Sequence, residues 1–200
     1  MINSHSKIIF ITGTPGVGKT TIATELYKKL AKNYSCLLIK INDLAIENDL
    51  IDGEDLDKGY KIVNIDKLDE KLKISIDYFF NEASDDFNNL KIAIVEGHLS
   101  HLCSLHGMAD KVVVLRLNPN ILEERLNSRK YSQSKIQENL EAEALAVCSV
   151  EAYDIHDESV NEVDTTELSV EKVLAIIEGI LFKEDKYPVG NVDFLNWILE

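Results

Sequence analysis

The sequence predicts an α/β fold in which helices cover both faces of a parallel five-stranded sheet, and three observations support this prediction. Short runs rich in Ile and Val alternate with longer segments in which apolar residues recur every three or four positions. The short runs do not alternate with polar residues, which is typical of strands buried on both faces. The chain also has 200 residues, 45% of them hydrophobic, which is enough for one domain with a full core.

Five runs predict strands, the last of them weaker than the others: residues 7–12, 36–40, 91–95, 111–117 and 159–165. Five segments have helical spacing: residues 20–31, 66–80, 119–128, 134–153 and 169–182. Ser169 begins the last of these segments, where its hydroxyl can cap free N–H groups. Because strands and helices alternate along the chain, we expect parallel strands and a three-layer domain.

The charge of the chain limits its partners. It carries 35 acidic and 21 basic side chains, a net charge of −14. Such a chain repels phosphate on average, which excludes a non-specific binder of DNA, RNA or anionic lipid. Only three basic residues are arginines, and Arg116, Arg125 and Arg129 lie within fourteen consecutive positions.

The cysteine pattern and the hydropathy indicate a compartment. Cys36, Cys103 and Cys148 are odd in number and form no C-x-x-C pair, which argues against a disulfide framework. No stretch reaches the roughly 18 apolar residues of a membrane span, and the first apolar run is too short for a signal peptide. We therefore expect a cytoplasmic protein that binds no membrane.

Residues 13–20, GTPGVGKT, form a complete phosphate-binding motif, G-x-x-x-x-G-K-T, between a predicted strand and a predicted helix. Its glycines let the backbone wrap an anion. We expect Lys19 to bridge the β- and γ-phosphates, the Thr20 hydroxyl to bind Mg²⁺, and Thr21 to reach the α-phosphate. The sequence therefore predicts a site for ATP with Mg²⁺, built from Gly13, Gly16, Gly18, Lys19, Thr20 and Thr21.

Two stretches interrupt the alternation of strands and helices. The first covers residues 42–66, which contain only two basic residues, Lys58 and Lys61. Its eight acidic residues are Asp43, Glu47, Asp49, Asp52, Glu54, Asp55, Asp57 and Asp66. The second, residues 125–135, is basic and polar. Long insertions in compact domains usually serve as functional loops or lids.

Four segments together resemble the adenylate kinase 6/Fap7 family, above all its archaeal members: residues 13–21 (GTPGVGKTT), 42–45 (NDLA), 96–101 (EGHLSH) and 124–138 (ERLNSRKYSQSKIQE). The resemblance implies the P-loop NTPase fold of the nucleoside monophosphate kinases. It also implies conversion of ATP and AMP into two ADP, tolerance for other monophosphates, and ATP hydrolysis. A further implication is a role in small-subunit and rRNA maturation, in which the protein holds ribosomal protein uS11.

The resemblance also divides the chain. It implies one kinase domain over residues 1–200, with a monophosphate-binding insertion at 40–63 and a lid at 128–138. Residues 183–200 form a C-terminal tail, whose apolar side chains around Trp197 are expected to pack back onto the body. A docking role for this tail is the alternative.

The catalytic residues that the resemblance implies are Lys19, Glu96, His98 and Arg129. Arg125, Arg129 and Lys130 are assigned to the lid, where a guanidinium suits phosphate oxygens better than an ammonium does. The alternative for Arg125 is a plain surface residue of a helix. Arg116 lies inside a strand run, which favours a structural role or a place near the triphosphate.

Glu96 ends the third strand, at the carboxyl edge where such sheets bind ligands. With Thr20 it forms the predicted metal-binding pair, although the family usually has Asp at this position. His98 matches the family's histidine, which implies a role in turnover and in positioning water. His98, His101, Cys103 and His106 could also suggest zinc, but the sequence has no second cluster to complete a tetrahedron.

The acceptor side is the weaker part of the resemblance. Asp43 and Leu44 match the monophosphate-binding region, whereas Ile46 stands where many relatives carry a basic residue. Residues 164–166 (DTT) match the segment that lines the adenosine of ATP. Two alternatives stay open: a kinase of another small acceptor, and an ATP-driven assembly factor. In the second alternative, the acidic segments 43–66 and 154–171 attract a basic protein.

Overall fold

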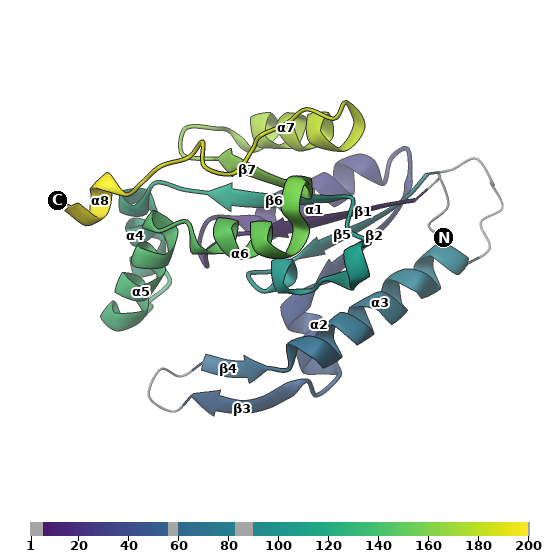
Figure 1. The fold of residues 1–200 in the computed structure, drawn as a ribbon, viewed down its shortest axis with the longest axis horizontal. Helices are drawn as coiled ribbons and strands as arrows, with labels where there is room; N and C mark the ends of the chain where they lie inside the picture. Colours follow the sequence, from purple (N-terminus) through teal and green to yellow (C-terminus); the bar gives the residue numbers. More distant parts are fainter. Residues whose placement is uncertain (1–5, 56–59, 83–89, 200) are drawn as a thin grey trace.

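A computed structural model, which describes residues 6–55, 60–82 and 90–199, confirms the predicted fold (Figure 1). Its central sheet has five strands in the order β2-β5-β1-β6-β7, and every pair is parallel. The strands are β1 (Ser6–Thr12), β2 (Ser35–Lys40), β5 (Lys91–Glu96), β6 (Lys111–Arg116) and β7 (Val160–Asp164). The weak fifth run of the sequence is therefore a true strand of the sheet.

The register of the strands places the chemistry at one edge. Ile11 pairs with Glu96, and Thr12 pairs with Val114, so the segment after β1 begins beside the ends of β5 and β6. Lys40 at the end of β2 pairs with Glu96 from the other side. Because all strands run the same way, the loops that follow them gather at this carboxyl edge.

The sheet is covered on both faces. Ile9 and Ile11 point into a core shared with α1 (Lys19–Leu30) and α7 (Val170–Phe182). Ile8 and Phe10 point the other way, into a core shared with other helices: α2 (Ile41–Glu47), α3 (Ile65–Asn81) and α6 (Val147–His156). All four of these β1 side chains are fully buried, which explains why the strand sequence has no polar alternation.

The predicted single helix over residues 134–153 is wrong. The chain forms α5 (Gln133–Ala144), then a break at Ala146, then α6 (Val147–His156). Ala146 has a φ of 55°, in the left-handed region. The carbonyl of Glu143 accepts hydrogen bonds from Arg116 Nη2 at 2.6 Å and from the Ala146 amide at 3.1 Å. A tertiary contact therefore occupies a carbonyl that a continuous helix would use for its own ladder.

The other predicted helices are confirmed, with boundaries shifted by a few residues at most. They are α1, α3, α4 (Pro119–Ser128) and α7, and Ser169 caps α7 as expected. The described ranges also hold short 3-10 helices at Ser100–Leu102, Leu105–Gly107 and Asp157–Ser159. In the part of the chain that the structure describes, no helix combines the length and the apolar character needed to cross a membrane.

The insertion after β2 is not a plain loop. It consists of α2 followed by an antiparallel hairpin of β3 (Ile51–Asp55) and β4 (Tyr60–Val63), which extends away from the main sheet (Figure 1). Asn64 joins the hairpin to α3, because its side chain donates to Asp52 and accepts from the Lys67 amide. Asp57 and Lys58 of the acidic segment lie outside the described residues.

The tail packs back only in part. Trp197, in the short helix α8 (Asn196–Leu199), is half-buried, and its Nε1 donates to Asn120 of α4 at 2.8 Å. The Phe194 ring lies 5.4 Å from the guanidinium carbon of Arg116. Leu195 and Leu199 remain exposed.

Candidate active site

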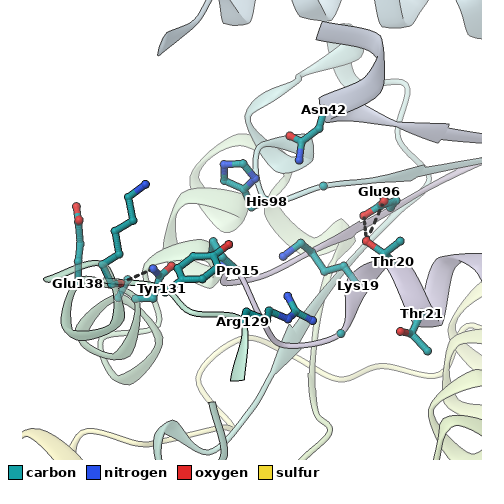
Figure 2. Close-up of a pocket in the computed structure, with 16 residues that line it drawn as sticks. Pro15, Lys19, Thr20, Thr21, Asn42, Glu96, His98, Arg129, Tyr131 and Glu138 are labelled. Carbon is teal, nitrogen blue, oxygen red and sulfur yellow. Dashed lines mark hydrogen bonds between the residues drawn. The ribbon is translucent and has the colours of Figure 1, made fainter. Parts of the chain in front are cut away.

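A cleft of about 570 Å³ opens at the carboxyl edge of the sheet, above the phosphate loop (Figure 2). Four parts of the chain form its walls: the loop with the start of α1, the first turn of α2, the segment after β5, and α5 with the turn before it. The lining residues are Pro15, Gly16, Gly18, Lys19, Thr20, Thr21, Asn42, Glu96, Gly97, His98, Arg129, Tyr131, Lys135, Glu138, Asn139 and Ala142.

The phosphate loop needs its glycines for two distinct reasons. Gly13 and Gly16 have φ values of 129° and 103°, which side chains rarely tolerate. A Cβ at Gly13 would overlap the carbonyl oxygen of Leu115. A Cβ at Gly16 would lie 2.7 Å from Leu122 Cδ1 of α4. The loop is thus pressed against β6 and α4, and it leads directly into α1, whose first N–H groups are free to bind an anion.

Lys19 is held inside this loop. Its side chain is 8% exposed, and Nζ donates to the carbonyls of Gly13 at 2.7 Å and Thr14 at 3.0 Å. Burial lowers the pKa of Lys19 to about 8. The loop therefore fixes a single ammonium group in a position that lines the cleft.

The two residues predicted to bind metal lie together. The Thr20 hydroxyl donates to both carboxylate oxygens of Glu96, at 3.1 and 3.3 Å. Burial raises the pKa of the Glu96 carboxyl, and the Thr20 hydrogen bond and Lys19 act against that rise. A hydroxyl and a carboxylate are hard oxygen donors of the kind that Mg²⁺ prefers, so the residues present fit this ion.

His98 lies in the cleft between Lys19 and Asn42 (Figure 2). Burial, with a contribution from Lys19, lowers the pKa of His98 to about 4. The imidazole is therefore neutral at neutral pH, and it can orient a polar group by hydrogen bonding but supplies no positive charge. His101, from the same sequence motif, is buried elsewhere and contacts Thr12 and Glu151.

Arg125 and Arg129, the two arginines assigned to the lid from the sequence, have different positions. Arg129 follows α4 and lines the cleft. Arg125 instead donates from Nη1 to the carbonyl of Val17 at 3.1 Å, so it binds the backbone of the phosphate loop. Lys130 is exposed and is not part of the cleft lining. Arg116 is buried beside Glu143 and Glu162, which supports the structural alternative for this residue.

A second cavity of about 310 Å³ lies on the other side of the phosphate loop. Arg125, Arg129 and Thr165 are among its lining residues. Asp164 and Thr166 do not line it, because they bond to each other within the turn after β7. Of the segment predicted to contact adenosine, Thr165 is therefore the residue that reaches a cavity.

The residues predicted for the acceptor side lie beside the cleft lining rather than in it. Asp43 and Leu44 do not line the cleft, whereas Asn42, one position earlier, does. Ile46 is 55% exposed and adds no charge to the site. Tyr131, Lys135 and Glu138 lie within the lid predicted at 128–138, but Asn139 and Ala142 of α5 lie beyond it and were not predicted. The signal was present, because the lining residues recur every three or four positions: Tyr131, Lys135, Glu138, Asn139 and Ala142.

Comparisons with known proteins identify the family of the chain. A family model described as an AAA domain matches residues 9–146. A protein of Methanothermobacter thermautotrophicus named "Putative adenylate kinase" is 41% identical over 96% of this chain and 99% of its own length. Proteins with the same name from Methanococcus maripaludis and Pyrococcus abyssi are 37% and 42% identical, each over 94% of this chain and over 95% and 91% of their own lengths.

A solved structure also matches. The thymidylate kinase of Candida albicans superposes with a TM-score of 0.52 over 90% of this chain and 92% of its own, at 14% identity. At that identity the match supports the fold alone, which is the fold of a nucleoside monophosphate kinase.

Proposed function

The chain belongs to the adenylate kinase family of these archaeal relatives, and from that membership we propose that it transfers the γ-phosphoryl group of ATP to AMP. The products are two molecules of ADP. The proposal includes tolerance for other nucleoside monophosphates and slow hydrolysis of ATP when no acceptor is bound.

One observation carries the proposal: groups suited to the donor, to the transfer and to the acceptor line a single cleft. Gly16, Gly18 and Lys19 belong to the phosphate loop, and Asn42 lines the same cleft from the first turn of α2. Arg129 reaches the cleft from the end of α4. A transfer between two nucleotides needs such a site, because both phosphates must lie in line and shielded from water.

The side chains then have separate tasks. Lys19 neutralises charge on the β- and γ-phosphates, and Arg129 stabilises the charge that develops on the transferred group. Thr20 and Glu96 would hold Mg²⁺, which supplies further positive charge to the phosphates. His98, being neutral, orients a polar group of the reactants rather than attracting phosphate. Positioning and electrostatics suffice for this chemistry, so no covalent intermediate is required.

The test is the reaction itself. Protein, Mg²⁺ and ATP are incubated with and without AMP, and ADP is measured over time. We expect AMP to raise the rate of ADP formation, and Lys19→Ala to abolish that rate while the protein stays folded. Equal rates with and without AMP would contradict the proposal. A panel of other monophosphates, nucleosides and coenzyme A precursors then distinguishes a kinase of another acceptor.

Asn42 offers a test of the acceptor side. Asn42→Ala should raise the KM for AMP and leave the KM for ATP nearly unchanged, because Asn42 reaches the cleft from α2 rather than from the phosphate loop. Asp43→Ala provides the comparison, since the sequence motif pointed to Asp43 and the geometry points to Asn42. A larger effect of Asp43→Ala on the KM for AMP would restore the assignment to Asp43.

A second candidate function rests on the charge of the chain. The net charge is −14, and exposed acidic residues on two segments, among them Asp43, Asp49, Asp154 and Glu158, suit a basic protein partner. We propose ribosomal protein uS11 as that partner, held and released in an ATP-dependent step of small-subunit maturation. A pull-down with recombinant uS11 at moderate salt, with and without ATP, tests this. Absence of a complex in both conditions would contradict it.

A further inference from the structure

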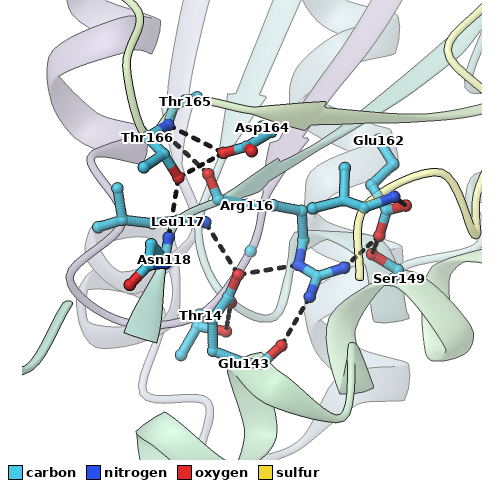
Figure 3. A network of polar contacts seen from close by, with 12 residues as sticks. Thr14, Arg116, Leu117, Asn118, Glu143, Ser149, Glu162, Asp164, Thr165 and Thr166 are labelled. Carbon is cyan, nitrogen blue, oxygen red and sulfur yellow. Dashed lines mark hydrogen bonds and ion pairs between the residues drawn. The ribbon is translucent and has the colours of Figure 1, made fainter. Parts of the chain in front are cut away.

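Glu143, the second-to-last residue of α5, is the centre of a buried polar network (Figure 3). Its side chain is 1% exposed. One carboxylate oxygen accepts from Arg116 Nε at 2.8 Å and from the Leu117 amide at 3.0 Å. The other oxygen accepts a short hydrogen bond from the hydroxyl of Thr14 in the phosphate loop. A residue 129 positions away in sequence thus contacts the loop that is built to bind phosphate.

The contact with Thr14 leads directly to Lys19. The hydroxyl of Thr14 bonds to Glu143, and its carbonyl accepts from Lys19 Nζ at 3.0 Å. Thr14 is 2% exposed, so its orientation is fixed by these partners rather than by solvent. Glu143 therefore holds the side chain of Thr14, whose carbonyl accepts from the Val17 amide at 3.3 Å and is one of the two carbonyls that hold the Lys19 ammonium.

The rest of the network fixes Glu143 itself. Arg116 is 1% exposed and lies between Glu143 and Glu162, so it forms an ion pair with each of these two buried carboxylates. Glu162 is held in turn by Ser149 Oγ at 2.7 Å and by the amides of Gly190 and Val192 at 3.0 and 3.2 Å. Buried charges with this many partners have one arrangement, because any other leaves a charge unpaired.

The same helix also lines the cleft. Asn139 and Ala142, within the turn before Glu143, are cleft residues. On the other side of the lid, Arg125 of α4 donates to the carbonyl of Val17. The phosphate loop is therefore attached to the α4–α5 pair at two points, Thr14 and Val17.

We propose that Glu143 is a positioning residue that holds the phosphate loop and, through Thr14, sets the place of Lys19 for nucleotide binding. The proposal rests on the proposed function, since it assumes that the loop binds ATP. It assigns Glu143 no contact with the nucleotide, and it makes the hydroxyl of Thr14 the group through which Glu143 acts.

The test changes that hydroxyl alone. Thr14→Val replaces it by a methyl group of similar size, and Thr14→Ser keeps it. We expect Thr14→Val to raise the Kd for ATP, measured by calorimetry with Mg²⁺, about tenfold and to lower kcat with AMP as acceptor. Thr14→Ser should recover most of both losses, which a change of loop packing alone would not produce.

Ser149→Ala is the matched control. It removes a buried donor from Glu162, in the same network but away from the loop. Thr14→Val and Ser149→Ala should both lower the melting temperature, because each leaves a buried carboxylate oxygen with fewer donors. Only Thr14→Val should change the Kd for ATP. An equal rise in Kd for both variants would overturn the proposal, because the effect would then be general loss of stability.

A double-mutant cycle tests Glu143 directly. Glu143→Gln removes the carboxylate that accepts from Thr14 and also weakens the pair with Arg116. Its effect on the Kd for ATP should be smaller in the Thr14→Val background than in the wild type, because the part that acts through Thr14 is already lost there. Fully additive effects would overturn the proposal. If Glu143→Gln does not fold, the Thr14 variants still decide the matter. A wild-type protein that binds no ATP would overturn the proposed function as well. Wild type and Thr14→Val binding ATP equally well would overturn this inference alone.

Discussion

The three arginines show how position decides the task of one residue type. Arg116 forms ion pairs with two buried carboxylates, and Arg125 binds a backbone carbonyl of the phosphate loop. Arg129 is exposed and lines both cavities. Within the described part of the chain, its guanidinium has no hydrogen-bond or ion-pair partner. The guanidinium that is least engaged with the protein is thus the one best placed for a phosphate.

Removing the Arg129 side chain should therefore affect catalysis more than stability. We expect Arg129→Ala to lower kcat by about tenfold or more, through lost stabilisation of charge in the transition state. The melting temperature should change little, because the side chain is exposed. Steady-state kinetics with ATP and AMP, together with thermal unfolding, check this. An unchanged kcat would remove Arg129 from the catalytic residues.

Lys19 predicts a pH dependence of ATP binding. Its pKa is lowered to about 8 by burial in the protein without nucleotide. Phosphate oxygens beside the ammonium favour its charged form, so the pKa rises in the complex. Above about pH 8, binding must then take up a proton, and the Kd for ATP should rise with pH by up to about tenfold per unit.

Calorimetry from pH 6.5 to 9.5 measures that dependence, using about three pH points on either side of the Lys19 pKa. Lys19→Arg is the control, because a guanidinium stays protonated throughout this range. Affinity that does not fall above the Lys19 pKa, or that falls equally in Lys19→Arg, would place the titration on another group.

At the scale of elements, the sequence was informative wherever local pattern and burial agree. The strands were predictable because β1, β5 and β6 are buried on both faces and therefore consist of continuous apolar runs. The hairpin of β3 and β4 was not, because its strands are short and β3 is mostly acidic. The break between α5 and α6 was also missed, since no Gly or Pro marks it and the contact of Arg116 with the Glu143 carbonyl beside it joins distant parts of the chain.

The site followed the same rule. The phosphate loop could be predicted in full, because its function depends on consecutive residues. Glu143 could not, because its partners Thr14, Arg116 and Leu117 come from distant parts of the chain. Asn42 lines the cleft one position before the predicted Asp43, since the face that the first turn of α2 presents to the cleft depends on where the helix begins.

The break at Ala146 predicts a stabilising substitution. Ala146 has φ 55° and ψ 33°, a left-handed conformation that glycine adopts without a steric cost. We expect Ala146→Gly to raise the free energy of unfolding by about 0.5–1 kcal/mol, measured in urea. Ala175→Gly, at an exposed position inside α7, should instead lower it by about 1 kcal/mol. A loss of stability at both positions would contradict the assigned conformation.

At the scale of the whole molecule, charge is separated between surface and cleft. The chain as a whole is strongly acidic, yet the cleft is lined by three basic side chains, Lys19, Arg129 and Lys135, against two acidic ones, Glu96 and Glu138. The cleft is therefore more favourable to phosphate than the average surface, which suits cationic partners.

The single tryptophan of the chain, Trp197, lies in the tail and is attached to a helix beside the cleft. The Trp197 indole donates to Asn120 of α4, and α8 contacts α5, so the tail is attached to the two helices that hold the predicted lid, residues 128–138 (Figure 1). If the lid closes over bound nucleotide, these helices move and the surroundings of the indole change.

We therefore expect ATP with Mg²⁺ to change the tryptophan emission of the protein, with a midpoint that matches the Kd from calorimetry. Lys19→Ala should show no change, because it removes the charge that holds the phosphates. Asn120→Ala should bind ATP normally but respond less, since Asn120 supplies the hydrogen bond that ties the indole to α4. An emission change of full size in Asn120→Ala would show that the tail responds to the nucleotide by a route other than α4.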